Sequence, residues 1–250
     1  MLNNFTIFNQ SLETIENPKV LISTINAHSY NSVCQDLDFQ RALQRSDVLL
    51  PDGISVVLAL RFLTGVKIKK IAGADLFKYE MERINSKGGK CFFLGSSEPT
   101  LRMIIQKSFV QFPNIQIFAY SPPYKEFFSP EDNEAMVNAI NFVEPDVLFI
   151  GMTAPKQEKW AYQNFERLKV GHVCCIGAVF DFYAGTVLRA PGWLISVGLE
   201  WLYRLVKEPR RLWRRYLIGN FKFVGSILQE KFISNHYPLQ NDLKSLNRLV

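Results

Sequence analysis

Short apolar runs alternate with longer amphipathic stretches along most of the chain. The runs are rich in β-branched, aliphatic and aromatic residues, as is typical of buried strands, and occupy 20–25, 48–50, 91–94, 115–120, 147–150 and 173–179. Helical spacing of apolar residues occurs between them, over 55–62, 75–85, 100–111, 130–142 and 156–168. This alternation predicts an α/β fold: a Rossmann-like, mostly parallel sheet with helices on both faces.

Polar or turn-forming residues follow the predicted strands. Thr24 and Asn26 end the first strand, and Asp52 lies in a Pro-Asp-Gly turn after the second. Gln157 and Glu158 follow the fifth strand. Because ligands of open parallel sheets bind beyond the carboxyl ends of the strands, we expect a ligand site at this edge.

Each of these side chains also has a purely structural interpretation. Asp52 is suited to be a general base held on a strand-end turn, but Asp is also a common helix N-cap, and the sequence favours neither role. Thr24 and Asn26 can bind ligand hydroxyls or simply form a turn. Gln157 and Glu158 can bind a ligand or cap the helix that they begin.

The last fifth of the chain differs from the rest in charge. The chain has a formal net charge of +6, and residues 200–250 carry ten Lys and Arg against four Asp and Glu, whereas the preceding residues are balanced. Helical spacing from residue 210 onward separates an apolar half from a half that contains Arg and Lys. We expect an α/β domain over 1–195 and a basic, amphipathic helical appendage over 196–250 that binds a membrane interface or a partner.

Three arginines of this appendage are candidates for binding an anion. Arg204, Arg211 and Arg214 are spaced by seven and three residues, so they share one helical face if Pro209 permits a continuous path. The alternative is contact with lipid headgroups or with solvent.

Other classes of protein are disfavoured by what the sequence lacks. There is no Gly-x-Gly-x-x-Gly after the first strand, no P-loop and no Gly-x-Ser-x-Gly. Asp36-Leu37-Asp38 lies in a probable helix, the three histidines are scattered, and the four cysteines form no pairing motif. No apolar run is long enough to span a membrane, and the first residues do not resemble a signal peptide. We expect a cytoplasmic protein with reduced thiols, no metal and no cofactor.

Seven motifs that occur in order between about residues 20 and 220 resemble the WecG/TagA/CpsF family, glycosyltransferase family 26. They are Thr24-x-Asn26, Pro51-Asp52-Gly53, Gly73-Ala74-Asp75-Leu76, Pro155-Lys156-Gln157-Glu158, Gly177-Ala178 with Phe180-Asp181, Arg189-Ala190-Pro191, and Glu200-Trp201-Leu202-Tyr203-Arg204 with Pro209 and Arg214-Arg215-Tyr216.

This resemblance implies an inverting glycosyltransferase that moves a sugar from a UDP donor to a polyprenyl-diphosphate-linked sugar, in the synthesis of teichoic acid or another cell-surface polymer. The sugar would be N-acetylmannosamine, its uronic acid or a hexose. With no credible set of metal ligands, arginines are the simplest groups to meet the charge of the departing UDP. The basic appendage would hold the enzyme on the anionic inner face of the membrane, where the lipid acceptor resides.

The resemblance also implies roles for individual residues. Asp52 would be the general base, Thr24 and Asn26 would line the sugar site, and Gln157 would touch the substrate. The candidate arginines of the appendage, Arg204, Arg211 and Arg214, would close over the active site and stabilise the diphosphate. Lys70 stands where relatives usually carry Arg, so a bidentate contact would become a point-charge contact and the role of this position is open.

Two rival functions follow from the same features. The basic, Trp-rich tail would also suit a non-catalytic module that grips single-stranded nucleic acid, but the charge-balanced body argues against it, and we expect no nucleic-acid partner. An epimerase acting on a nucleotide sugar would need a nicotinamide fingerprint that is absent. The apolar half of the tail also offers a surface for homo-oligomerisation where lipid is absent.

Overall fold

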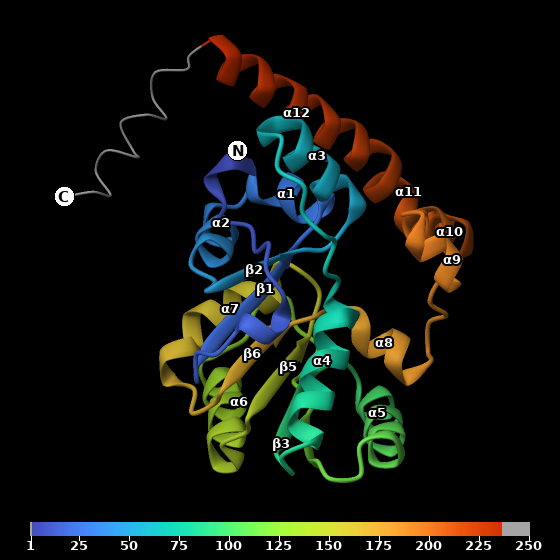
Figure 1. Cartoon of the computed structure of the whole chain (residues 1–250). Helices are drawn as coiled ribbons and strands as arrows, with labels where there is room; N and C mark the ends of the chain where they lie inside the picture. The colour runs from blue at the N-terminus through green and yellow to red at the C-terminus, as the bar shows by residue number, and fades with distance from the viewer. Residues whose placement is uncertain (1, 237–250) are drawn as a thin grey trace, which may run out of the picture.

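A six-stranded parallel sheet forms the centre of the computed structural model, which describes residues 2–236 (Figure 1). Its strands are β1 Val20–Ile25, β2 Val48–Pro51, β3 Lys90–Gly95, β4 Gln116–Tyr120, β5 Val147–Gly151 and β6 His172–Cys175. Their order across the sheet is β2-β1-β6-β5-β3-β4, and every neighbouring pair is parallel. The predicted Rossmann-like α/β fold is confirmed.

Helices cover both faces of the sheet (Figure 1). One face packs against α4 Gly73–Asn85, α5 Glu98–Gln111 and α8 Val179–Ala184, and the other packs against α6 Pro130–Val143 and α7 Lys156–Asn164. Successive strand residues serve opposite layers, since Phe93 lies in the first core cluster and Phe92 in the second. Burial on both faces explains why the strands are continuous apolar runs rather than alternating ones.

A third group of helices packs around the β1–β2 end of the sheet. It comprises α1 Ala27–Val33, α2 Leu37–Gln44, α3 Ile54–Thr64 and part of α12 Gly219–His236. Short 3₁₀ turns lie at Leu2–Asn4, Leu12–Thr14 and Phe165–Arg167.

The C-terminal segment is helical from Gly192 onward. Its elements are α9 Gly192–Ser196, α10 Glu200–Lys207, α11 Pro209–Trp213, a π-helical turn over Arg214–Ile218, and α12. Phe223 and Ile227 of α12 are buried against α1 and α3, and the Phe223 ring meets Tyr30 edge-on at 5.2 Å. The predicted appendage also includes residues 237–250, which lie outside the described residues.

The two ends of the described chain meet at α12. The backbone N–H of Leu2 donates to the Glu230 carboxylate at 2.8 Å, and the Tyr30 hydroxyl donates to the same oxygen at 3.3 Å. Glu230 is almost fully buried. These contacts fix α12 to the body through both polar and apolar groups.

Two local features differ from the sequence-based prediction. The last predicted strand, 173–179, ends at Cys175, because Gly177 adopts a positive φ of +54° and α8 begins at Val179. Helix α1 was not predicted; it is a short helix of seven residues whose N-cap, Asn26, accepts hydrogen bonds from the backbone of His28 and Ser29.

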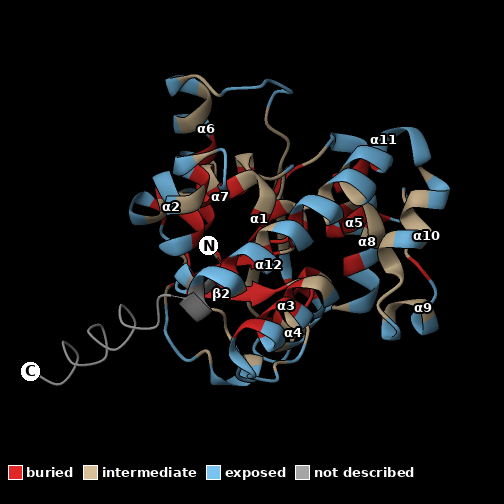
Figure 2. Cartoon of the chain, turned by 90° about the horizontal axis from the view of Figure 1, so that it is seen from above, coloured by how far each residue is buried: buried red, intermediate tan, exposed pale blue. Residues whose placement is uncertain are grey.

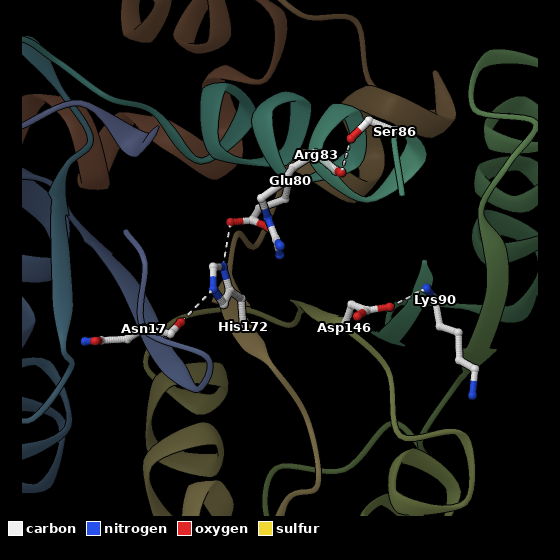
Figure 3. Close-up of polar contacts among 7 residues, drawn as sticks. All are labelled: Asn17, Glu80, Arg83, Ser86, Lys90, Asp146 and His172. Carbon is white, nitrogen blue, oxygen red and sulfur yellow. Dashed lines mark hydrogen bonds and ion pairs between the residues drawn. The ribbon is translucent and has the colours of Figure 1, made fainter. Parts of the chain in front are cut away.

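At the amino edge of the sheet, a buried carboxylate joins α4 to β6 (Figure 3). Glu80 is fully buried, and its Oε1 lies 2.8 Å from His172 Nδ1, whereas its Oε2 lies 2.7 Å from Arg83 Nη2. The other ring nitrogen of His172 lies 3.2 Å from the Asn17 carbonyl oxygen. The cluster therefore ties α4, β6 and the segment before β1 together.

We expect Glu80→Gln to lower the free energy of unfolding by about 3 kcal/mol, because it leaves Arg83 and His172 facing a neutral amide in a buried setting. Glu82→Gln is the matched control, since Glu82 forms an exposed ion pair with Lys78 on the same helix and should change stability by less than about 0.5 kcal/mol. Urea denaturation measures both. Equal effects of the two changes would refute the structural role of the buried cluster.

Candidate functional site

Parallel pairing brings the residues that follow β1 and β2 together at the carboxyl edge of the sheet. Ile25 is in register with Pro51, and the Asp52 N–H donates to the Ile25 carbonyl at 2.9 Å. A Cβ atom added at Gly53 would lie 3.5 Å from the Asn26 Cβ atom. The turns that carry Asn26 and Asp52 therefore lie side by side, as the sequence predicts.

Asp52 does not cap the helix that follows it. Helix α3 begins at Ile54, its N-cap residue is Gly53, and no side chain caps it. Among the described residues, no hydrogen bond reaches the Asp52 carboxylate, although the residue is more than half buried. The structural interpretation of Asp52 as an N-cap is thus wrong, and the carboxylate is available to a ligand.

Charged residues from three segments surround Asp52. The pKa of Asp52 is raised to about 6, mainly by burial and also by Glu200 and Asp75, whereas Lys70 and Arg189 oppose the shift. Since carboxylates that accept protons in catalysis work best with a pKa near the working pH, this environment suits a general base.

Glu200, the first residue of α10, links Lys70 and Arg189 at this edge. Its carboxylate lies 4.0 Å from Lys70 Nζ and 3.5 Å from Arg189 Nε. The backbone N–H of Ile71 donates to Pro51 O at 3.1 Å, which holds the Lys70 segment against the end of β2. The structure therefore places Lys70 at the candidate site, where Glu200 partly offsets its positive charge.

The structure divides the candidate arginines into two groups. Arg204 is partly buried, and its Nε atom is buried without a hydrogen-bond partner, while its guanidinium lies over the Phe182 ring at 5.1 Å. Arg211 is 63% exposed and forms an ion pair with Glu208 at 2.6 Å. Arg214 is exposed and lies over Trp213.

Arg215 faces the site, although the sequence interpretation did not select it. Its Nε atom is also buried without a hydrogen-bond partner. Burial lowers the pKa of Arg215, as does nearby Arg204, whereas Tyr216 and Asp52 raise it. Among the described residues, neither Arg204 nor Arg215 forms an ion pair within 4.0 Å. Arg215 interacts electrostatically with Asp52 and with Arg204, so these two partly buried guanidinium groups are open to an anion.

His28 of α1 lies within the electrostatic reach of this group. The pKa of His28 is lowered to about 4, mainly by burial and also by the positive charge of Arg215. The imidazole is therefore neutral at physiological pH and adds no charge beside the two arginines. No feature of the sequence distinguished His28, because its relation to Arg215 depends on packing between α1 and the π-helical turn.

The other two predicted residues of the first turn are held in place by the end of β1. Thr24 is 8% exposed. The Asn26 Oδ1 atom accepts from the backbone N–H groups of His28 and Ser29, each at 3.0 Å, so the oxygen serves as the N-cap of α1. Asn26 thus has a structural role as an N-cap in place of the simple turn that the sequence suggested, and its amide nitrogen is the group that can meet a ligand.

Gln157 and Glu158 pair with each other. Both residues are buried, and Gln157 Nε2 donates to Glu158 Oε1 at 2.8 Å. No side-chain cap is present at the start of α7. The alternative role as caps is thus wrong for both side chains.

The described residues contain no group of three or more His, Cys, Asp or Glu side chains placed to hold a metal ion. Asp36 caps α2 and forms an ion pair with Lys159 of α7 at 2.9 Å, so it is more than a solvated helix residue. Asp38 pairs with Arg41 on the surface. The Asp36-Leu37-Asp38 motif is accounted for by these contacts.

Comparison with known proteins gives a match over nearly the whole chain. The model of the glycosyl transferase WecG/TagA/CpsF family matches residues 3–237. An N-acetylglucosaminyldiphosphoundecaprenol N-acetyl-beta-D-mannosaminyltransferase of Bacillus subtilis (strain 168) is 33% identical over 220 residues, which cover 87% of this chain and 83% of the relative. The protein of the same name from Bacillus spizizenii is 30% identical over 243 residues, covering 95% of this chain and 92% of the relative.

With UDP as a diphosphate probe, we expect Arg215→Gln to weaken binding by about tenfold or more, because one of the two guanidinium groups open to an anion is removed. Arg211→Gln is the matched control: Arg211 is exposed and paired with Glu208, and its loss should weaken binding by less than about threefold. Titration calorimetry measures both affinities. A larger loss at Arg211 than at Arg215 would show that the exposed arginines bind the anion.

Proposed function

Because the chain belongs to the glycosyl transferase WecG/TagA/CpsF family, we propose that it transfers N-acetylmannosamine from a UDP donor to a polyprenyl-diphosphate-linked N-acetylglucosamine. The names of the two Bacillus relatives support this choice of sugar and acceptor. The observation that carries the proposal is the Asp52 carboxylate, held at a strand end, free of capping contacts and raised in pKa to about 6. The polymer would be a teichoic acid or a related cell-surface glycan.

In the proposed reaction, Asp52 acts as the general base of an inverting displacement. The carboxylate takes the proton of an acceptor hydroxyl while that oxygen bonds to the anomeric carbon of the sugar. The bond from the anomeric carbon to the UDP oxygen breaks in the same step, with inversion. Thr24 and Asn26, beside Asp52 at the end of β1, would bind the sugar.

Positive charge from the C-terminal segment would stabilise the departing UDP. Arg204 and Arg215 are the first candidates because both are partly buried and lack ion-pair partners among the described residues, and because Arg215 interacts electrostatically with both Asp52 and Arg204. Such preorganised donors act most strongly where water is excluded. Arg211 and Arg214 are exposed and would meet the diphosphate of the lipid acceptor or the headgroups around it. Lys70, paired with Glu200, would contribute a point charge.

The C-terminal helix has an open apolar strip suited to a membrane surface. The strip consists of Trp213, Leu217, Phe221, Val224 and Leu228, which are 42–78% exposed. Helix α12, which carries the last three, shows exposed stretches in pale blue in Figure 2. Spacings of three and four residues place Phe221, Val224 and Leu228 along one side of α12, while Phe223 and Ile227 pack inward. Trp213 and Leu217 precede them along the chain as further exposed apolar residues. No described helix is long and apolar enough to cross a membrane. We therefore propose that the strip and the nearby arginines hold the enzyme on the inner face of the membrane.

We expect Asp52→Asn to lower transfer by about 10²–10⁴-fold, because the amide cannot accept the hydroxyl proton. UDP affinity should be unchanged or higher, since a negative charge near the phosphates is removed. In the unmodified enzyme, turnover should fall as the pH drops below about 6, where Asp52 becomes protonated. Transfer of radiolabelled N-acetylmannosamine to a short-chain lipid-diphosphate acceptor measures these effects. Near-native turnover of the variant would place the base elsewhere.

We expect Phe221→Ser to weaken binding to vesicles of phosphatidylcholine and phosphatidylglycerol by about tenfold, because a large apolar side chain no longer enters the lipid. Phe142→Ser on α6 is the matched control, since Phe142 is also highly exposed but lies away from the strip. Co-sedimentation measures binding, and sedimentation velocity shows whether the strip instead joins two copies of the chain. If the native chain does not bind vesicles but forms a dimer that dissociates in the Phe221 variant, the strip is a dimer interface and not a membrane-binding surface.

A further inference from the structure

Two buried acceptor oxygens on neighbouring residues of α7 lack hydrogen-bond partners. Gln157 and Glu158 are 3% and 2% exposed. The Oε1 atom of Gln157 and the Oε2 atom of Glu158 have no partner, whereas Gln157 Nε2 donates to Glu158 Oε1. Buried polar groups are nearly always hydrogen-bonded, so this pair requires an explanation.

We propose that Glu158 is a positioning residue that fixes the carboxamide of Gln157, so that Gln157 Oε1 accepts a hydrogen bond from an O–H or N–H group of the bound nucleotide sugar. The inference rests on the proposed function, which assigns the ligand class. It adds a role for Glu158, and it gives Gln157 a defined hydrogen-bond direction.

The direction follows from the chemistry of the two side chains. An ionised carboxylate can only accept hydrogen bonds, so the Gln157 amide must turn its NH₂ group toward Glu158. The reversed amide would place two acceptor oxygens against each other in a buried setting, which is unfavourable. Oε1 of Gln157 therefore points away from the Glu158 carboxylate.

The Gln157 amide lies against a turn at the carboxyl edge of the sheet. A Cβ atom added at Gly177 would lie 3.5 Å from Gln157 Nε2 and 3.6 Å from Gln157 Oε1. Gly177 follows β6, which pairs with β1 in the sheet, so this turn lies at the same edge as Asn26. Asp52, the proposed base, and the Gln157 amide thus lie at the same edge of the sheet.

Glu158 is buried beside Gln157. Its pKa is raised to about 7, mainly by burial, whereas the hydrogen bonds from Gln157 and from its own backbone N–H oppose this shift. The carboxylate in turn raises the pKa of the Cys175 thiol at the end of β6. Whether or not Glu158 Oε2 carries a proton, Oε1 remains an acceptor for the Gln157 amide.

The unpartnered oxygen limits what the amide can recognise. A phosphate oxygen is an acceptor and would be repelled by Gln157 Oε1, whereas a sugar hydroxyl, an acetamido N–H or a base N–H is a donor. The diphosphate is therefore expected at the arginines, and the donor groups of the sugar or uracil at Gln157. A site built around a buried acceptor also discriminates strongly against ligands that lack the matching donor.

The test is a double-mutant cycle on transfer kinetics with UDP-N-acetylmannosamine. Glu158→Gln should lower kcat/KM by about tenfold through a higher KM for the donor sugar, because the introduced amide can also donate and no longer fixes the orientation of Gln157. In the Gln157→Ala background, Glu158→Gln should change kcat/KM by less than about twofold, because the amide that Glu158 orients is gone. Glu82→Gln, on the exposed side of α4, is the control and should have no effect.

A second variant pair tests the same contact by rescue. Gln157→Glu alone places two carboxylates together and should lower activity at about pH 8, whereas the swapped variant Gln157→Glu with Glu158→Gln restores one donor and one acceptor and should recover it. If Glu158→Gln does not fold, as circular dichroism would show, Glu158→Asp takes its place in the cycle.

The outcomes separate this inference from the proposed function. Native enzyme without any transfer would refute the proposed function. Native transfer combined with equal effects of Glu158→Gln in both backgrounds, or with no rescue by the swap, would overturn the positioning role alone. Coupling in the cycle together with rescue supports it.

Discussion

Parallel pairing of β1 with β2 on one side and β6 on the other is the constraint on which the site depends. In such a sheet all strands end at the same edge, so residues more than a hundred positions apart in the sequence meet there. The hydrogen bond from Asp52 N–H to the Ile25 carbonyl continues the ladder one residue beyond β2. The turn that carries the Asp52 carboxylate is thus held by the same hydrogen-bond ladder as the strands.

The C-terminal segment completes the site by bringing charge to this edge. Glu200 is placed near Asp52, where its negative charge helps to keep the pKa of Asp52 raised, and it also binds Lys70 and Arg189. Arg215 supplies an opposing positive charge from the π-helical turn. The balance between these groups, rather than any one of them, sets the basicity of the carboxylate. An anion that binds the arginines would therefore also change the pKa of Asp52.

The fold was largely predictable because burial on both sheet faces produces continuous apolar runs, as in β5. The end of β6 was missed because Ile176 and Val179 extend the apolar run past the turn at Gly177. Arg215 belongs to the last sequence motif but was not selected as an anion-binding residue, because a regular helical wheel assumes about 100° per residue. The π-helical turn changes this angle. The pairing of Gln157 with Glu158 depends on burial, which spacing does not reveal.

The contact between Leu2 and Glu230 has a consequence for the order of folding. It joins residues 228 positions apart, and β1 pairs with β6 across more than a hundred positions. Closing such long loops loses chain entropy before the contacts can stabilise the fold, so contacts of this kind form slowly. The packing of α12 on the body is therefore expected to form late, after the local helices and the neighbouring strands β3 and β4 have paired.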